Sequence, residues 1–111
     1  MTRVKSGVLV SAALRYANTA LIDCVLERRG DEDAGAIFVH IDARDGRHKL
    51  LARSLNFEGK YEWHIITNTE WIDAEAAAIR LTAEMKIDQD AFIVSVCDAE
   101  ARNPFDALWR V

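Results

Sequence analysis

Apolar and polar residues alternate in short runs along most of the chain, and in two longer stretches apolar residues recur every three or four positions. Alternation is typical of strands, and the longer spacing is typical of helices. The expected order is β-α-β-β-β-β-α-β, which predicts an α+β fold with a mainly antiparallel sheet and two helices. We expect strands over residues 4–10, 23–29, 36–42, 47–55, 60–66 and 91–97, with helices starting after Ser11 and after Asn68 or Thr69.

The clearest local signal is the pair Asp45-Gly46 between two predicted strands. This pair is typical of a two-residue type I′ hairpin turn. A loop of two residues places Ile41 opposite Leu50, and Asp42 opposite Lys49. In that register His40 and His48 point to opposite sides of the sheet, so we expect no site that the two histidines share.

Both predicted helices carry an apolar stripe, and the last strand is almost wholly apolar. Stripes at helical spacing normally face the core, so we expect both to be buried. The apolar run over residues 91–97 predicts a strand at the centre of the sheet. The stripes consist of Leu14, Ala17 and Leu21 in the first helix, and of Ile72, Ala76, Ile79, Ala83 and Ile87 in the second.

Composition adds limits on size, compartment and partners. The 111 residues, half of them hydrophobic, fit a single domain over residues 1–111 that ends in a short aromatic tail over residues 103–111. The net charge of −4 argues against a nucleic-acid partner, because nucleic-acid binders normally present a basic surface. Apolar runs are too short to span a membrane, and we expect a cytoplasmic protein.

Candidate chemistry is sparse. Cys24 and Cys97 lie in apolar strands, where we expect two small core residues and no disulfide. No pair of cysteines or histidines has the spacing of zinc ligands, and no phosphate-binding or nucleophile motif occurs. We therefore expect no metal, no cofactor and no catalytic residue. The sequence favours a non-enzymatic protein and leaves an enzymatic role open.

The segment from Arg28 to Gly35 is the best candidate for a ligand site. The guanidinium groups of Arg28 and Arg29 beside two glycines suit a carboxylate or phosphate, with Asp31 and Asp33 in the same loop. The alternative is a tight polar connection whose arginines pair with neighbouring acids. One functional hypothesis is thus that the protein binds a small molecule or an anion through this loop, either as a binding protein or as an enzyme.

The same segment carries a family resemblance. Arg28-Arg29-Gly30-Asp31-Glu32-Asp33-Ala34-Gly35, followed by an aliphatic strand, resembles the signature of a small alphaproteobacterial family of unknown function. The resemblance extends to residues 8–15 and to residues 88–90, and the family's members have about 110 residues. It implies one compact bacterial domain. Because the family has no established activity, it implies no catalytic residue and no ligand.

The C-terminal tail is the candidate interface. Asn103 and Pro104 suit the start of a short helix on which Phe105, Leu108 and Trp109 share one face. Such a face is covered either by its own domain or by a partner, and aromatic residues anchor many interfaces. The preferred functional hypothesis is therefore a protein-interaction or regulatory module that self-associates, with a homodimer or another protein as its partner.

Overall fold

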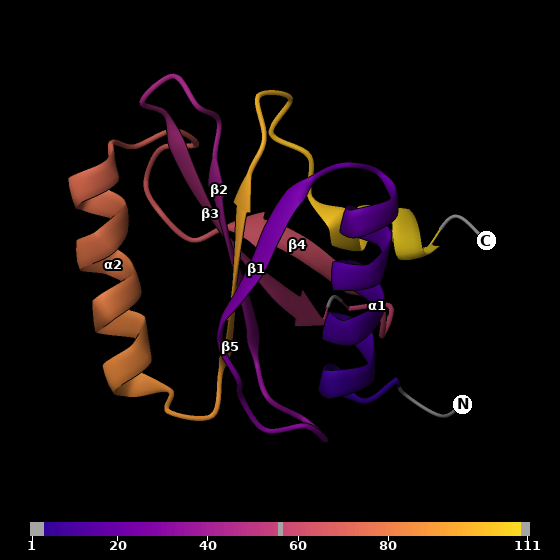
Figure 1. Cartoon of the computed structure of the whole chain (residues 1–111). Helices are drawn as coiled ribbons and strands as arrows, with labels where there is room; N and C mark the ends of the chain where they lie inside the picture. The colour runs from indigo at the N-terminus through magenta and orange to yellow at the C-terminus, as the bar shows by residue number, and fades with distance from the viewer. Residues whose placement is uncertain (1–3, 56, 110–111) are drawn as a thin grey trace.

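The chain forms an α+β fold with one mixed, mostly antiparallel sheet, so the predicted fold class is confirmed (Figure 1). The computed structural model describes residues 4–55 and 57–109. The described elements are α1 (Ser6–Thr19), β1 (Asp23–Arg28), β2 (Ile37–Asp42), β3 (His48–Leu55), β4 (Tyr61–Ile65), α2 (Ala74–Ile87), β5 (Phe92–Cys97) and the 3-10 helix η1 (Pro104–Trp109).

The sheet has the strand order β1-β5-β2-β3-β4. β5 runs parallel to β2, and the other three pairs of neighbouring strands are antiparallel. The last strand of the chain therefore lies inside the sheet, with Phe92, Val94 and Val96 buried. Its apolar run predicted this central position correctly, because both cores include side chains of β5: Val94 lies in the core under α1, and Ile93 lies in the core beside α2.

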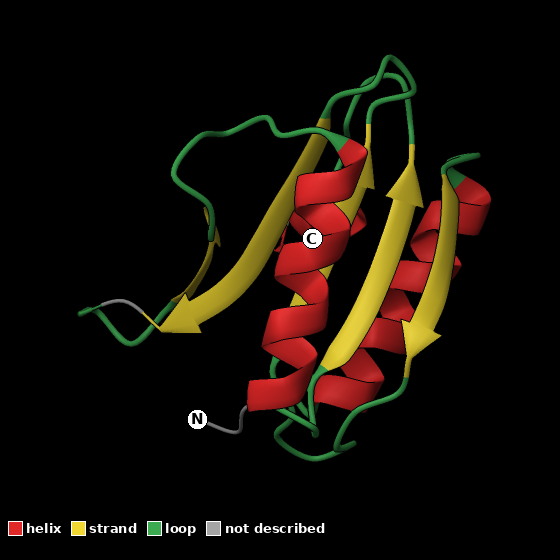
Figure 2. Cartoon of the chain, turned by 90° about the vertical axis from the view of Figure 1, so that its left-hand side faces the viewer, coloured by secondary structure: helices red, strands yellow, loops and turns green. Residues whose placement is uncertain are grey.

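The two faces of the sheet are covered unequally. α1 and η1 pack on one face, over a core that includes Leu9, Val39 and Phe105. α2 packs on the other face, over a smaller core with Leu50 and Ile93. Figure 2 shows α2 in front of β2 and β3, while no helix lies in front of β5 and β1 on that side.

The strand expected over residues 4–10 is wrong, because this segment is the first half of α1. The buried residues of α1 recur every three or four positions, as expected for one side of a helix; they include Ser6, Leu9, Val10, Ala13 and Ala17. The same apolar run therefore fits a helix as well as a strand. No side chain caps the start of α1. A contact from a distant loop replaces the cap, as described below, and a local pattern cannot reveal such a contact.

The predicted hairpin register is also wrong, by one residue. Asp42 lies opposite His48, and Ile41 lies opposite Lys49. Ala43 and Arg47 are still joined by a hydrogen bond of 3.0 Å from the Ala43 amide, so the loop has three residues instead of two. Arg44 and Gly46 within it have positive φ, of 70° and 88°. Three-residue hairpin loops form a common class of their own. Changing the loop from an even to an odd number of residues reverses the face on which β3 side chains lie, relative to β2.

Four of the five residues in the apolar stripe expected to be buried on the second helix face away from the sheet, namely Ala76, Ile79, Ala83 and Ile87, whereas Ile72 lies before the helix and packs against the core. α2 buries Ala77 and Leu81 instead. It also begins later than expected, at Ala74, where the Asp73 carboxylate accepts a hydrogen bond of 2.8 Å from the Ala76 amide. The preceding residues cannot join the helix because Ile72 pairs with His48 as an isolated β-bridge.

Candidate interaction surface

The Arg28–Gly35 loop is held by contacts within the chain. Each of the four side chains proposed as ligand-binding, those of Arg28, Arg29, Asp31 and Asp33, has a partner in the structure. Arg28 donates a hydrogen bond of 2.5 Å to the Gln89 carbonyl, and Arg29 pairs with the Glu32 carboxylate. The Asp31 carboxylate accepts a hydrogen bond of 3.1 Å from the Ala34 amide, and the Asp33 carboxylate lies 3.4 Å from the Lys5 ammonium.

The backbone of this loop caps α1. The amides of Ser6 and Gly7 donate to the carbonyls of Asp33 and Glu32, at 3.4 and 2.8 Å, and the Ser6 hydroxyl donates to the Gly35 carbonyl at 2.7 Å. The first amides of a helix otherwise lack partners. A Cβ on Gly35 would lie 2.5 Å from the Asp90 carbonyl oxygen, so this position requires glycine. These contacts match the alternative in which the loop is a structural connection.

The corrected register brings two histidines together. His40 Nε2 and His48 Nδ1 are 2.8 Å apart, so one ring donates a hydrogen bond to the other. Burial, and then the charge of His48, lowers the pKa of His40, and the nearby carboxylates of Asp42 and Glu27 oppose this effect only in part. Within the described ranges, no group of three or more His, Cys, Asp or Glu residues is arranged to hold a metal ion. The hydrogen bond between the two rings needs one unprotonated nitrogen as its acceptor, so this contact is sensitive to protonation.

The C-terminal tail folds back onto its own domain. Phe105 is fully buried, and its ring lies 4.9 Å from the ring of Trp63. Leu108 is partly buried against the same core. The side chain of Trp109, the third residue expected at an interface, lies outside the described residues. Phe105 therefore belongs to the core, and the domain itself covers the described part of this apolar face, while an interface at Phe105, Leu108 and Trp109 stays a prediction.

An apolar face is nevertheless exposed elsewhere, on α2. Ala76, Ile79, Ala83 and Ile87 recur at helical spacing and are all exposed. The exposed fractions of Ile79 and Ile87 are 64% and 80%. We call these four residues the outward face of α2. On an α-helix they lie opposite Leu81, which contacts the sheet side.

Charged residues border this face on both sides. Arg80 and Glu84 form an ion pair of 2.8 Å along one border. At 100° per residue, Glu75 and Lys86 share the other border, near opposite ends of the helix. Each border thus carries one acidic and one basic residue, and the two residues of a border are separated along the axis of α2.

Comparison with known proteins now identifies the family. Residues 4–106 match the model of a family described as "Protein of unknown function (DUF1491)". The chain belongs to the DUF1491 family. The family resemblance seen at residues 28–35 is thereby confirmed. Among curated proteins none matches the chain.

Solved structures share the fold of this DUF1491 protein. A crystal structure of a family member from Caulobacter crescentus is 22% identical, with a TM-score of 0.83 over 92% of this chain and 94% of that one. An NMR structure of a Caulobacter crescentus member, also 22% identical, gives 0.80 over 94% of each chain. A solution structure from A. tumefaciens is 28% identical, with a TM-score of 0.72 over 86% of each chain.

These matches establish a bacterial family of unknown function. Neither α1 nor α2, the two α-helices of the described chain, has the length and apolar character needed to cross a membrane.

Proposed function

We propose that this DUF1491 protein is a non-enzymatic, cytoplasmic interaction module that self-associates through the outward face of α2. The observation that carries the proposal is the exposure of four apolar side chains at helical spacing. Scattered exposed apolar residues are ordinary, but a continuous helical stripe is typical of a surface that another helix covers. The two free cysteines agree with a reducing compartment.

The borders of the outward face favour a second copy as the partner. Two identical helices that pack face to face in antiparallel orientation are related by a two-fold axis. With Ile79 of one copy beside Ala83 of the other, Glu75 lies beside Lys86 of the second copy. On the other border, Arg80 comes next to Glu84 of the second copy. All four contacts join opposite charges, so the surface is complementary to itself in this orientation.

The expected dimer is weak. A helix of 14 residues is about 21 Å long. A contact along one such helix covers less than the 1,200–2,000 Å² of stable interfaces, so we expect a dissociation constant of about 10–1,000 μM. Isoleucine side chains supply most of the apolar area that this contact removes from water.

Sedimentation equilibrium tests the proposal between about 10 μM and about 1 mM. The wild type should shift from the 12.5 kDa monomer towards twice that mass as concentration rises. The double variant Ile79→Glu, Ile87→Glu should stay monomeric, because each buried carboxylate would lack a partner. Val8→Glu is the matched control, since Val8 is 60% exposed on α1, and it should dimerise like the wild type.

Two results would overturn this proposal. One is a wild type that stays monomeric over the whole concentration range. The other is an equal loss of dimer in Val8→Glu, which would show that any added charge acts in the same way. Anion binding by Arg28, Arg29, Asp31 and Asp33 stays a prediction. Their contacts within the chain give it no support.

A further inference from the structure

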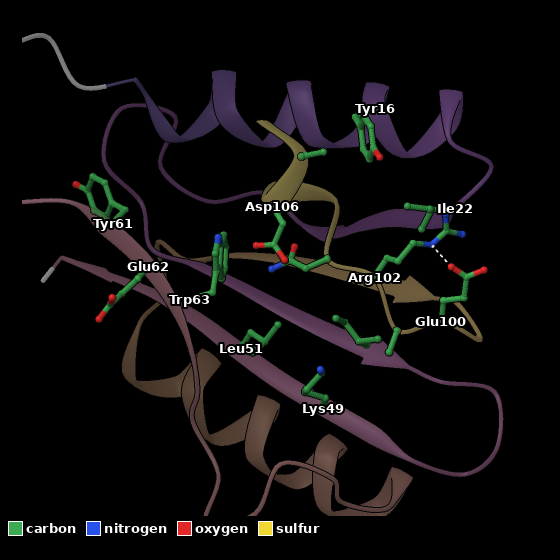
Figure 3. Close-up of a pocket in the computed structure, with 14 residues that line it drawn as sticks. Tyr16, Ile22, Lys49, Leu51, Tyr61, Glu62, Trp63, Glu100, Arg102 and Asp106 are labelled. Atoms are coloured by element: carbon green, nitrogen blue, oxygen red, sulfur yellow. Dashed lines mark ion pairs between the residues drawn. The ribbon is translucent and has the colours of Figure 1, made fainter. Parts of the chain in front are cut away.

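A cavity of about 700 Å³ lies on the face of the sheet opposite α2 (Figure 3). Its walls come from the C-terminal half of α1, from η1 and the segment before it, and from β2, β3 and β4. This volume is within the usual range for small-molecule sites. Because α2 lies on the other face, the cavity is independent of the proposed dimer contact.

The lining of the cavity combines aliphatic and aromatic side chains. Ile41 and Leu51 come from the sheet, and Tyr16 and Trp63 contribute rings. The Trp63 ring packs against the buried ring of Phe105, and this contact fixes its position. Figure 3 shows Leu51, Trp63 and Tyr16 on different sides of the same space. These side chains suit a ligand with a flat apolar portion.

The two bases of the lining, Lys49 and Arg102, are already paired with acids. The Lys49 ammonium lies 3.6 Å from the Glu70 carboxylate. Arg102 makes two side-chain hydrogen bonds of 2.9 Å to Asp98 and a contact of 3.6 Å to Glu100. The side-chain hydrogen bonds are the largest cause that lowers the pKa of Asp98 below its ordinary value, so Asp98 stays ionised at neutral pH and offsets the charge of Arg102.

The other charges around the cavity are engaged as well. Asp106 takes part in an interaction within the chain. Glu62 precedes Trp63 in β4, so its side chain points to the opposite face of the sheet. Arg53 lies on the cavity side of β3, where its guanidinium stacks on the Tyr61 ring, 4.1 Å from the centre of the ring. Within the described part of the chain, the protein itself thus engages these charges, which favours a neutral ligand.

One hydrogen-bond donor in the lining has no acceptor. Asn103 directly precedes η1, and its Oδ1 accepts a hydrogen bond of 3.1 Å from the Phe105 amide. This bond fixes the orientation of the side-chain amide, because exchanging its oxygen and nitrogen would bring two donors together. The Nδ2 group is buried and has no hydrogen-bond partner within residues 4–55 and 57–109. Buried donors almost always have an acceptor, so this group indicates an acceptor from outside the chain.

From this combination we propose that the cavity binds a small neutral molecule that has a flat apolar portion and a carbonyl oxygen. The Trp63 ring and the aliphatic lining contact the apolar portion, and Asn103 Nδ2 donates a hydrogen bond to the carbonyl oxygen. A charged ligand would lose its hydration without gaining a free counter-charge. Because Nδ2 is covered in this structure, side chains of the wall must shift to admit the oxygen, so we expect a dissociation constant of about 1 mM.

Four aromatic probes of similar size test the proposal. Acetophenone is neutral and has a carbonyl group, fluorobenzene lacks the carbonyl group, and benzoate and benzylammonium carry opposite charges. Each probe is titrated into the protein up to about 10 mM, while backbone amide and side-chain amide chemical shifts are recorded. We expect saturable shifts at Trp63 and at the Asn103 side-chain amide with acetophenone, and affinities at least about ten-fold weaker for the other three probes.

Two results with the wild type would overturn the proposal. One is the absence of saturable shifts with acetophenone, which would leave a buried water molecule as the acceptor for Asn103. The other is binding of fluorobenzene, benzoate or benzylammonium that is as tight as the binding of acetophenone. These comparisons need no variant, so they hold whatever a substitution does to folding.

A substitution then tests the donor itself. Asn103→Ser removes the Nδ2 group and keeps an oxygen that can accept from the Phe105 amide, since serine is a preferred residue before a helix. Acetophenone should bind this variant about five- to ten-fold more weakly, whereas the affinity of fluorobenzene should stay within about two-fold. Asn68→Ser is the matched control, because Asn68 is exposed and outside the lining, and it should change neither affinity. Equal weakening of acetophenone and fluorobenzene in Asn103→Ser would overturn the assignment of the donor.

Discussion

The C-terminal tail and α2 both carry an apolar stripe, but only the stripe of the tail is buried within the chain. For Phe105 and Leu108 the sequence leaves cover by the domain or by a partner open, and Phe105 is fully buried in its own domain. Ile79 and Ile87 carry the pattern of a core stripe, yet they are exposed. A periodic apolar pattern shows that a face will be covered, but it does not show by what. Whether the cover comes from the same chain depends on where the topology puts each element.

The topology gives a physical reason for the difference. η1 follows β5 and contacts α1 on a face where α1 alone leaves part of the sheet to be covered. α2 lies across β2 and β3, where Ala77 and Leu81 already fill the contact. A single helix on a sheet can bury one side only, so its second apolar side stays in solvent unless another molecule covers it.

The largest expected effect comes from removing the buried ring of the tail. Phe105→Ala should lower the free energy of unfolding by about 3–5 kcal/mol, because it leaves a cavity in the core. Ile79→Ala should change it by less than about 0.5 kcal/mol, because the side chain is already in water. Urea unfolding at low concentration, where the protein is monomeric, measures both values. Similar losses for the two variants would contradict the contrast between tail and helix.

The second prediction concerns pH and the histidine pair on the side of the sheet that α2 covers. The folded state holds the pKa of His40 below its ordinary value, so this contribution to stability is complete above about pH 6.5 and is lost as pH falls. For one proton, the free energy of unfolding should fall by up to about 1.4 kcal/mol per pH unit below that point. Urea unfolding at pH 7.5, 6.5 and 5.5 gives the slope.

A substitution identifies the group responsible. His40→Gln removes the proton-binding site and should flatten the slope between pH 7.5 and 5.5, whereas the exposed His64 changed to Gln should leave it unchanged. An unaltered slope in His40→Gln would assign the pH dependence to other groups.

Because His48 also holds Ile72 through backbone hydrogen bonds of 2.8 and 2.9 Å, acid should loosen the start of α2 before it loosens η1.

The smallest expected effect comes from charges beside the outward face of α2. Lys86→Glu puts a like charge beside Glu75 of the second copy and should weaken the dimer about three- to ten-fold. The reciprocal pair Glu75→Lys with Lys86→Glu should restore most of the affinity, because both contacts again join opposite charges. Sedimentation equilibrium compares the three proteins. Failure of the double variant to recover would exclude the antiparallel orientation.

Local sequence pattern predicts an element correctly where the structure that the pattern favours is also the one that the packing of the whole fold requires. The run from Phe92 to Cys97 suits only a covered strand, and it lies in the centre of the sheet. The first helix is expected to start only after Ser11, whereas it begins at Ser6, because its cap comes from the carbonyls of residues 32 and 33, far along the chain. A local pattern contains no trace of such a partner.

The candidate site was less predictable for a related reason. The histidine pair depends on whether the loop between β2 and β3 has two or three residues, and Asp-Gly suits both kinds of turn. The apolar spacing on α2 was visible, but its exposure depends on how much of the sheet a single helix covers. The cavity joins residues from four separate parts of the chain, and no motif links them.

The most direct test of the central claim detects contacts between copies. In a mixture of isotope-labelled and unlabelled protein at high concentration, filtered nuclear Overhauser spectra report methyl groups of one copy near those of another. The account predicts contacts between Ile79 of one copy and Ala83 of the other. Contacts between copies at Val8 or Val25 in place of these, or no contacts at a concentration where sedimentation shows dimer, would contradict it.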